Sequence, residues 1–185
     1  MVQMNTRIDD FLRTNGFDEH TRDSGRLLAG FAAEMAAGLA GEPSSLPMIP
    51  AYLSVDRPVP ADKPVIVLDA GGTNLRVGVV QFDAAGTPHI SRFSRHKMPG
   101  ATAPISADDF FNTLADLLMP VVDAAETIGF CFSYPAEITP DGDGRLLRWS
   151  KQIQAPEVEG RMVGAEVVQR LAARGHKRRA AGRRC

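Results

Sequence analysis

A short run of residues, Asp69–Arg76 (DAGGTNLR), combines the groups needed to hold phosphate and a hydrated metal ion. Asp69 ends an apolar run and is suited to hold Mg²⁺, which usually keeps several of its waters. The glycine pair permits backbone angles that other residues avoid and lets main-chain N–H groups approach an anion. Thr73 and Asn74 add donors, and Arg76 adds a cation suited to phosphate oxygens. The pattern favours a phosphate-binding turn over a glycine turn that binds nothing.

The elements around this run are predicted to be strands. Residues 65–82 alternate between β-branched runs and the glycine turn, which indicates a β-hairpin, and a third strand is expected near residues 89–95. A helix is predicted to begin at Ser106, with Asp109 three residues later. Residues 127–133 predict a buried strand, residues 135–149 a second hairpin and residues 163–171 a short helix. This order predicts an α/β fold with one sheet covered by helices.

The rest of the chain divides by composition. Residues 1–42 predict a helical arm with apolar residues at three- and four-residue spacing, and residues 43–63 predict a proline-rich loop. Residues 64–175 form the predicted α/β domain. Residues 176–185 form a basic tail without an apolar run, for which no strand is predicted. The turn at residues 140–144 resembles a calcium loop superficially, but Gln152 stands at the twelfth position, where Glu is required.

Charge and cysteine content exclude several classes of protein. The net charge is −1, and six of the 21 Lys and Arg lie after residue 173, so the rest holds 15 against 22 acidic residues. This acidic body argues against a nucleic-acid-binding protein. The two cysteines predict neither a disulfide framework nor a zinc site. No signal peptide or membrane-spanning run is expected, which predicts a cytoplasmic protein without a membrane partner.

Four further segments accompany the phosphate run in a fixed order. They are Ser45–Tyr52 (SLPMIPAY), Gly129–Pro135 (GFCFSYP), Leu147–Lys151 (LRWSK) and Val158–Gly160 (VEG). With the DAGGTNLR run, they resemble the motifs of the hexokinase family, over roughly residues 20–175. The resemblance implies a ribonuclease-H-like, actin-like ATPase small lobe with a mixed sheet and flanking helices, preceded by an N-terminal helical arm. A second lobe would be absent from this chain.

The resemblance also implies a function and roles for individual residues. The family transfers the γ-phosphoryl group of ATP, with Mg²⁺, to the 6-hydroxyl of glucose or a related hexose. The phosphate run would line ATP, Asp69 would hold Mg²⁺ through water, and Ser133 would bind the hexose. Lys151 would bind a sugar hydroxyl and act as the catalytic cation, and Ser150 would keep the hydroxyl of the family's usual Thr. The residues implied for the phosphates are Asp69, Gly71, Gly72, Thr73, Asn74 and Arg76.

One part of the family pattern is missing. The base that accepts the proton of the sugar hydroxyl is, in hexokinases, an Asp in an Asn-Asp-Thr segment after the last predicted helix, and this chain has no Asn-Asp pair. We therefore expect a chain truncated before its base and inactive alone, with a tail translated from a shifted reading frame. We also expect self-association through the surface that a second lobe would cover.

Other interpretations remain open from the sequence. Ser133 has an alternative as a plain serine at the end of a strand, and Lys151 as a solvated surface lysine. The chain as a whole has alternatives as a non-catalytic sugar- or phosphate-binding module, as a sugar kinase of the same superfamily with another acceptor, or as a module that binds an anionic partner through its basic tail.

Overall fold

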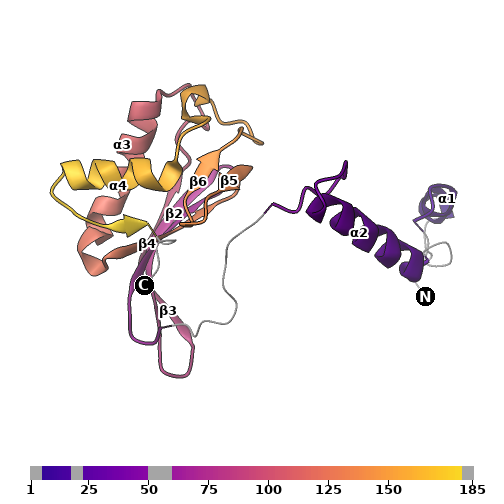
Figure 1. The fold of residues 1–185 in the computed structure, drawn as a ribbon, viewed down its shortest axis with the longest axis horizontal. Helices are drawn as coiled ribbons and strands as arrows, with labels where there is room; N and C mark the ends of the chain where they lie inside the picture. The colour runs from indigo at the N-terminus through magenta and orange to yellow at the C-terminus, as the bar shows by residue number, and fades with distance from the viewer. Residues whose placement is uncertain (1–5, 18–22, 50–59, 181–185) are drawn as a thin grey trace. The chain divides into compact units, whose positions relative to one another are not determined.

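The computed structural model describes residues 6–17, 23–49 and 60–180. The chain forms two compact units, residues 1–49 and residues 50–185, whose arrangement relative to one another is not determined. Figure 1 shows the first as helical and the second as a sheet with helices. None of the helices in the described ranges is long and apolar enough to cross a membrane.

The first unit contains α1 (Thr6–Thr14) and α2 (Ser24–Leu39), within the range predicted to be helical. The Asp23 carboxylate caps α2 by accepting a hydrogen bond from the Arg26 amide at 3.0 Å. Glu34 accepts hydrogen bonds from the Ser45 amide at 2.8 Å and its hydroxyl at 2.9 Å, which fixes the chain after α2. These bonds lower the pKa of Glu34. The remainder of the Ser45–Tyr52 motif, from residue 50, lies outside the described residues.

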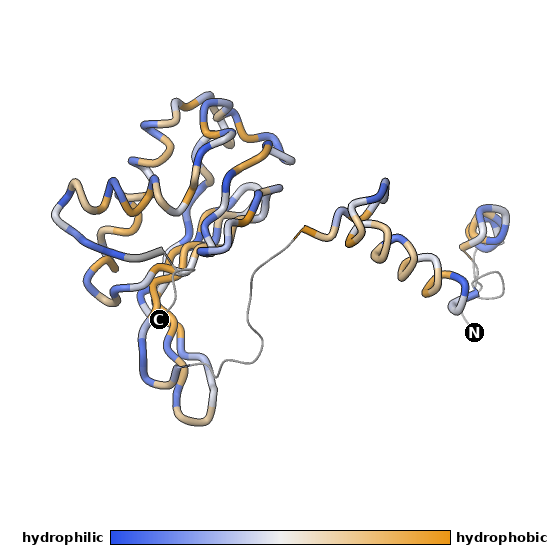
Figure 2. Tube along the Cα trace, in the orientation of Figure 1, coloured by the Kyte–Doolittle hydropathy of each residue, from blue (hydrophilic) through white to orange (hydrophobic). Residues whose placement is uncertain are grey.

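The second unit is built on a five-stranded mixed sheet with the strand order β3-β2-β1-β4-β7. The predicted hairpin forms: β1 (Val65–Ala70) pairs antiparallel with β2 (Asn74–Phe82). The third strand is β3 (Pro88–Lys97), antiparallel to β2, and β4 (Thr127–Phe132) runs parallel to β1. Figure 2 shows apolar residues following the central strands of this sheet.

Two predictions about the strands were wrong. The strand at residues 127–133 is not buried along its length: Ile128 is 2% exposed, whereas Cys131 is exposed, because its side chain lies on the face of the sheet that carries Asp69, opposite the core. A strand also forms where none was predicted. β7 (Arg179–Ala180) pairs parallel with β4, since backbone pairing at an edge needs no apolar side chains.

The helices cover one face of the sheet. α3 (Ala107–Leu118) begins after Ser106, whose hydroxyl accepts from the Asp109 amide at 3.1 Å as predicted, and passes into the 3₁₀ helix η1 (Met119–Ala124). The other helices are η2 (Pro156–Val158) and α4 (Val163–Ala173). The core joins buried residues of β1 and β2 to those of α3 and α4, and includes Ile66, Leu68, Leu75, Phe110, Phe111, Leu114 and Leu171. Because side chains alternate along a strand, Asp69 and Arg76 lie on the opposite face.

The second hairpin consists of β5 (Ala136–Ile138) and β6 (Gly144–Leu146). Its turn is used by the fold. The Asp143 carboxylate accepts hydrogen bonds from the amides of Gly164 at 2.8 Å and Ala165 at 2.9 Å, at the start of α4. A carboxylate at a helix N-terminus satisfies otherwise unpaired N–H groups and the helix dipole. The turn therefore ties the hairpin to α4.

Candidate functional site

The predicted phosphate turn connects β1 to β2 at one end of the sheet. It closes with a hydrogen bond from the Gly71 amide to the Asn74 carbonyl at 2.9 Å. One of the two predicted reasons for its glycines, unusual backbone angles, was wrong, because neither Gly71 nor Gly72 adopts a positive φ. Space explains them instead. A Cβ on Gly72 would lie 2.5 Å from Cδ of Lys151, and a Cβ on Gly71 would lie 3.2 Å from the Asn74 carbonyl oxygen.

Charged side chains form a row across the face of the sheet beside this turn. Asp69 is paired in register with Arg76 on β2, and Arg76 donates to the Asp69 carboxylate at 2.7 Å. Arg95 lies opposite Arg76 on β3, and its Nε donates to the Asn74 side-chain oxygen at 3.0 Å. Arg95 was not among the residues predicted from the sequence, although its place in the third predicted strand was the available signal. The turn is thus held from two strands by guanidinium groups.

Cys131 completes this row on β4, in register with Asp69. Partial burial raises the pKa of the Cys131 thiol, and the neighbouring Asp69 carboxylate raises it further through its charge and a hydrogen bond. The thiol therefore stays protonated near neutral pH and is a weak nucleophile.

Two of the motif segments meet at the phosphate turn: Gly129–Pro135, called the sugar segment after its predicted role, and Leu147–Lys151, called the lysine segment. The Ser133 amide donates to the Ala70 carbonyl at 3.2 Å, which continues the β1–β4 pairing and sets the exposed Ser133 beside the turn. Lys151 Nζ donates to the Ser133 carbonyl at 3.3 Å, while its methylene chain lies against Gly72. Lys151 is thus exposed but contacts both segments. Ser150 is exposed next to it, and its hydroxyl has no hydrogen-bond partner in the described part of the chain.

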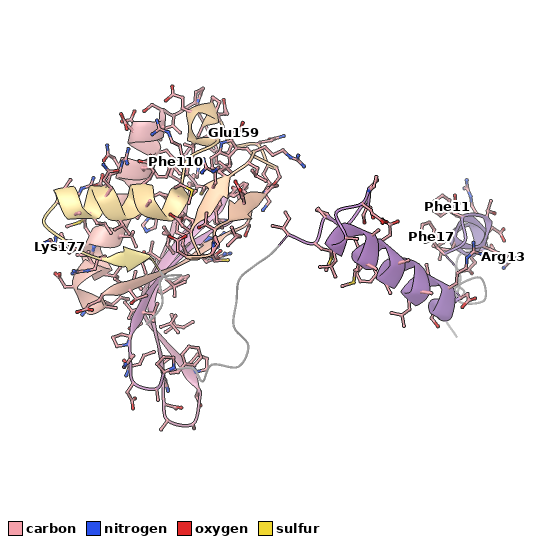
Figure 3. All side chains as sticks on the ribbon, in the orientation of Figure 1. Phe11, Arg13, Phe17, Phe110, Glu159 and Lys177 are labelled. Atoms are coloured by element: carbon pink, nitrogen blue, oxygen red, sulfur yellow. The ribbon has the colours of Figure 1, made fainter. Side chains whose placement is uncertain are left out.

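A cluster of aromatic side chains packs the sugar segment against the lysine segment. The Trp149 ring contacts the rings of Phe110, Phe132 and Tyr134, with centroids 4.7 Å apart in the last pair. Trp149 Nε1 donates to the Ala155 carbonyl at 2.7 Å, and its amide donates to Glu159 at 2.9 Å (Phe110 and Glu159 are labelled in Figure 3). These bonds use both N–H groups of Trp149 within the protein, so the residue serves in packing.

Tyr134 is 7% exposed and joins the cluster to the turn, because its hydroxyl donates to the Gly71 carbonyl at 2.8 Å. Burial raises the pKa of Tyr134 to about 12. The hydroxyl is therefore a hydrogen-bond donor throughout the neutral range. The sequence analysis assigned Tyr134 no role of its own; its position directly after Ser133 was the only signal.

The turn has the donors that a polyphosphate needs. Within residues 60–180, the amides of Gly72 and Thr73 donate to no protein acceptor, and the Thr73 side chain is exposed. Main-chain amides beside guanidinium groups favour an anion. The Asp69 carboxylate fits a hydrated Mg²⁺ shared with phosphate oxygens. The described residues hold no group of three or more His, Cys, Asp or Glu side chains that would bind a metal by themselves.

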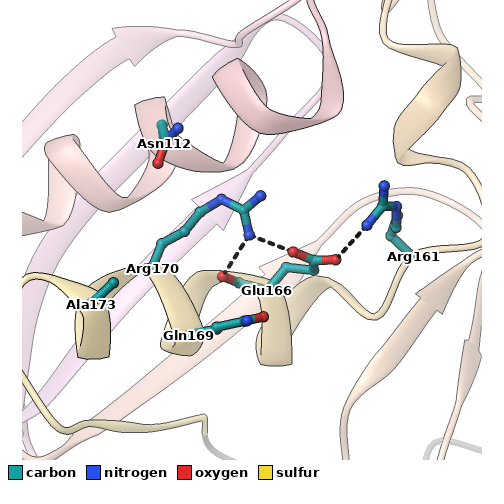
Figure 4. A pocket seen from close by; sticks show the side chains of 6 residues that line it. All are labelled: Asn112, Arg161, Glu166, Gln169, Arg170 and Ala173. Atoms are coloured by element: carbon teal, nitrogen blue, oxygen red, sulfur yellow. Dashed lines mark hydrogen bonds and ion pairs between the residues drawn. The ribbon is translucent and has the colours of Figure 1, made fainter.

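A separate pocket of about 430 Å³ lies on the helical side of the unit (Figure 4). Its charges neutralise one another. Glu166 pairs with Arg170 and with Arg161, the latter at 3.0 Å, and Arg170 also binds Asp108 at 2.8 Å. Because these charged groups already bind each other, we place no chemistry in this pocket. It is lined by Asn112, Arg161, Glu166, Gln169, Arg170 and Ala173.

The comparisons with known proteins agree on one family. A family model described as hexokinase matches residues 9–181 and so continues past Gly175, where the sequence analysis ended the resemblance. The chain is 30% identical over 146 residues to Hexokinase-1 of Schizosaccharomyces pombe, covering 75% of this chain and 30% of that protein. It is 31% identical over 139 residues to Hexokinase-2 of Saccharomyces cerevisiae, covering 70% of this chain and 28% of that protein.

A solved structure shares the fold. The hexokinase from Schistosoma mansoni complexed with glucose superimposes with a TM-score of 0.66 and 27% sequence identity, over 80% of this chain and 36% of that one. The predicted α/β fold with a mixed sheet and flanking helices is thereby confirmed. The chain spans about 30% of the length of the curated relatives it matches.

Proposed function

Because the chain belongs to the hexokinase family, we propose that its site serves the transfer of a phosphoryl group from ATP to the 6-hydroxyl of glucose or a related hexose. The observation that carries this proposal is the contact of Lys151 with both Gly72 of the phosphate turn and Ser133 of the sugar segment. Phosphoryl transfer depends on holding donor and acceptor next to each other in a fixed geometry. One lysine that touches both segments is suited to that task.

Each part of the site has a role in this proposal. The free amides of Gly72 and Thr73, together with Arg76, bind the phosphate oxygens of ATP, and Asn74 is held in place by Arg95. Asp69 holds Mg²⁺ through water, and the bound ion would neutralise charge on the phosphates. The Ser133 and Ser150 hydroxyls and the Lys151 ammonium orient the sugar. Lys151 also places a positive charge beside the group in transfer.

Proton removal from the sugar hydroxyl needs a base, and none of the described residues of this site is suited to that role. Asp69 is the carboxylate nearest the turn in the row described above, and it accepts a hydrogen bond from Arg76 at 2.7 Å, so the proposal gives it the Mg²⁺ role and not that of the base. Lys151 donates to a carbonyl group rather than to a carboxylate. We therefore propose that this 185-residue chain binds ATP and hexose without turning them over. This proposal agrees with the alternative interpretation of the chain as a non-catalytic sugar- or phosphate-binding module.

The experiment is a two-dimensional NMR titration of the ¹⁵N-labelled chain with glucose and, separately, with Mg-ATP. We expect Mg-ATP to shift the amides of residues 71–74 and glucose to shift those of Ser133 and Lys151. Lys151→Met should weaken glucose binding by about tenfold or more, since it removes one charged hydrogen-bond donor. Lys177→Met is the matched control, because Lys177 is an exposed lysine outside this site.

Two outcomes decide between the parts of the proposal. Absence of shifts with both ligands at millimolar concentration would refute the proposed site. Glucose-dependent formation of ADP in a coupled assay, above the level of the Lys151→Met variant, would instead show that the chain turns over and contains a base that we have not identified.

A further inference from the structure

Tyr134 links two segments that are far apart in the sequence. Its hydroxyl donates to the carbonyl of Gly71, 63 residues away, at 2.8 Å. Packing alone does not require this bond, because a phenylalanine ring would make the same contacts with Phe132 and Trp149. A buried hydroxyl without a partner is destabilising, so the bond fixes the place of the Gly71 carbonyl relative to the ring.

The same ring also contacts the sugar side of the site. Lys151 Nζ lies over the face of Tyr134, 5.1 Å from the ring centroid. A cation at this distance from an aromatic face is attracted by the ring quadrupole. The main chain of Tyr134 directly follows Ser133, whose carbonyl accepts the hydrogen bond from Lys151. Tyr134 therefore touches the phosphate turn through its oxygen and the sugar-binding lysine through its ring.

These contacts connect the three segments: Tyr134 contacts both Gly71 and Lys151, and Lys151 lies against Gly72. The turn has two consecutive glycines, which restrict the backbone least, so a bond to its carbonyl removes conformations that the turn would otherwise visit. A sugar that orders Ser133 and Lys151 would also order the tyrosine between them and, through its hydroxyl, the turn.

We propose that Tyr134 is a positioning residue that couples hexose binding at Ser133 and Lys151 to nucleotide binding at the phosphate turn, an inference that rests on the proposed function. Coupling between two sites is reciprocal, so each ligand should raise the affinity for the other by the same factor. The coupling is carried by ordering of the turn, which is measurable as slower opening of its backbone hydrogen bonds.

The test compares the full 185-residue chain with Tyr134→Phe, which removes one oxygen and keeps the ring. Calorimetry measures the dissociation constant of Mg-ATP with and without saturating glucose. We expect glucose to tighten Mg-ATP binding about fivefold or more in the unmodified chain and to leave it almost unchanged in the variant. Affinity for glucose alone should change by less than about twofold, because the ring stays beneath Lys151.

A second measurement separates positioning from general stability. Amide hydrogen exchange reports opening of the bond from the Gly71 amide to the Asn74 carbonyl. We expect exchange at Gly71 to be about tenfold faster in Tyr134→Phe and unchanged at Val79 and Val80 in the middle of β2. Thr113→Val is the matched control, because it also removes a hydroxyl that donates to a main-chain carbonyl at 2.7 Å, on α3 and away from the turn, and it should leave exchange at Gly71 unchanged.

The outcomes distinguish failure of the proposed function from failure of the positioning role of Tyr134. If the unmodified chain binds neither ligand, the proposed function fails and this inference fails with it. If the chain binds both ligands but Tyr134→Phe keeps the full coupling, or if the Tyr134→Phe and Thr113→Val variants exchange alike at Gly71, the function stands and the positioning role of Tyr134 is refuted.

Discussion

At the scale of single residues, the phosphate turn shows how one amino acid can be required for different physical reasons. The glycine pair at residues 71 and 72 suggests unusual backbone angles, but both residues have ordinary ones. A larger residue does not fit at position 72, because the Lys151 methylene chain fills the space that a Cβ would need. The sequence shows where a glycine stands, whereas its packing partner, 79 residues later, becomes known only from the structure.

Cys131 provides a residue-scale prediction about pH. Since burial and Asp69 raise the pKa of its thiol, less reactive thiolate is present at pH 8 than for an ordinary cysteine. In a Cys185→Ser variant, Cys131 should react with a disulfide reagent several-fold more slowly in the folded chain than in urea. In the folded chain, the reaction rate should increase with pH mainly at pH values above the ordinary pKa of a cysteine. Asp69→Asn should speed the reaction, because it removes the negative charge. An unchanged rate in that variant would show that Asp69 does not act on the thiol.

At the scale of elements, the connections between strands and helices are fixed by carboxylates as well as by the core. Glu157 accepts from the Ala107 amide at 3.0 Å at the start of α3, and Asp143 accepts from Gly164 and Ala165 at the start of α4. Both acids come from segments far from the helix they cap. These contacts place the second hairpin and η2 against the helices.

Asp143→Ala tests this element-scale role. The variant leaves the amides at the start of α4 without their acceptor, so we expect the free energy of unfolding to fall by about 1–2 kcal/mol. Urea denaturation followed by far-ultraviolet circular dichroism measures the change. Glu137→Ala on the same hairpin is the control, because its ion pair with Arg145 is exposed and should contribute less than about 1 kcal/mol. Equal losses in the two variants would contradict the capping role.

At the scale of the whole molecule, the helical unit and the sheet unit differ in how they bury apolar side chains. The sheet unit has a continuous core, whereas neither α1 nor α2 buries a side chain within the described residues. Large apolar residues of α2 are more than half exposed: Leu27, Leu28, Phe31 and Leu39. A run of this kind on one helix favours association, because water-exposed apolar area is unfavourable.

We therefore expect the chain to self-associate at micromolar concentration. Sedimentation velocity over a tenfold range of concentration should show the average mass rising with concentration. Leu28→Glu should shift the distribution towards monomer, since it places a charge in the apolar run. Ile90→Glu is the control, because Ile90 is 66% exposed on β3 in the other unit. A monomer at all concentrations, or an equal effect of both variants, would contradict association through α2.

The local patterns of the sequence were sufficient to predict most of the elements, and they named most of the candidate site residues that the structure brings together. Alternation of apolar residues and the glycine turn identify β1, β2 and β3, and Ser106 and Asp109 identify the start of α3, because these signals depend on neighbours within a few residues. The family motifs likewise indicate Asp69, Ser133 and Lys151 as candidate site residues. The exposure of Cys131 and the short strand β7 were missed, since both depend on what lies beside β4.

What the sequence determined by itself is therefore the set of elements, the chemical groups available at the phosphate turn, and the family. What only the tertiary structure decided is which groups meet. The parallel pairing of β4 with β1 sets Ser133 beside the turn, and the aromatic cluster brings Lys151 against Gly72 and Tyr134 beneath Gly71. The physical reason is that contacts between residues 60 to 80 positions apart depend on strand register and core packing, which no short stretch of sequence specifies.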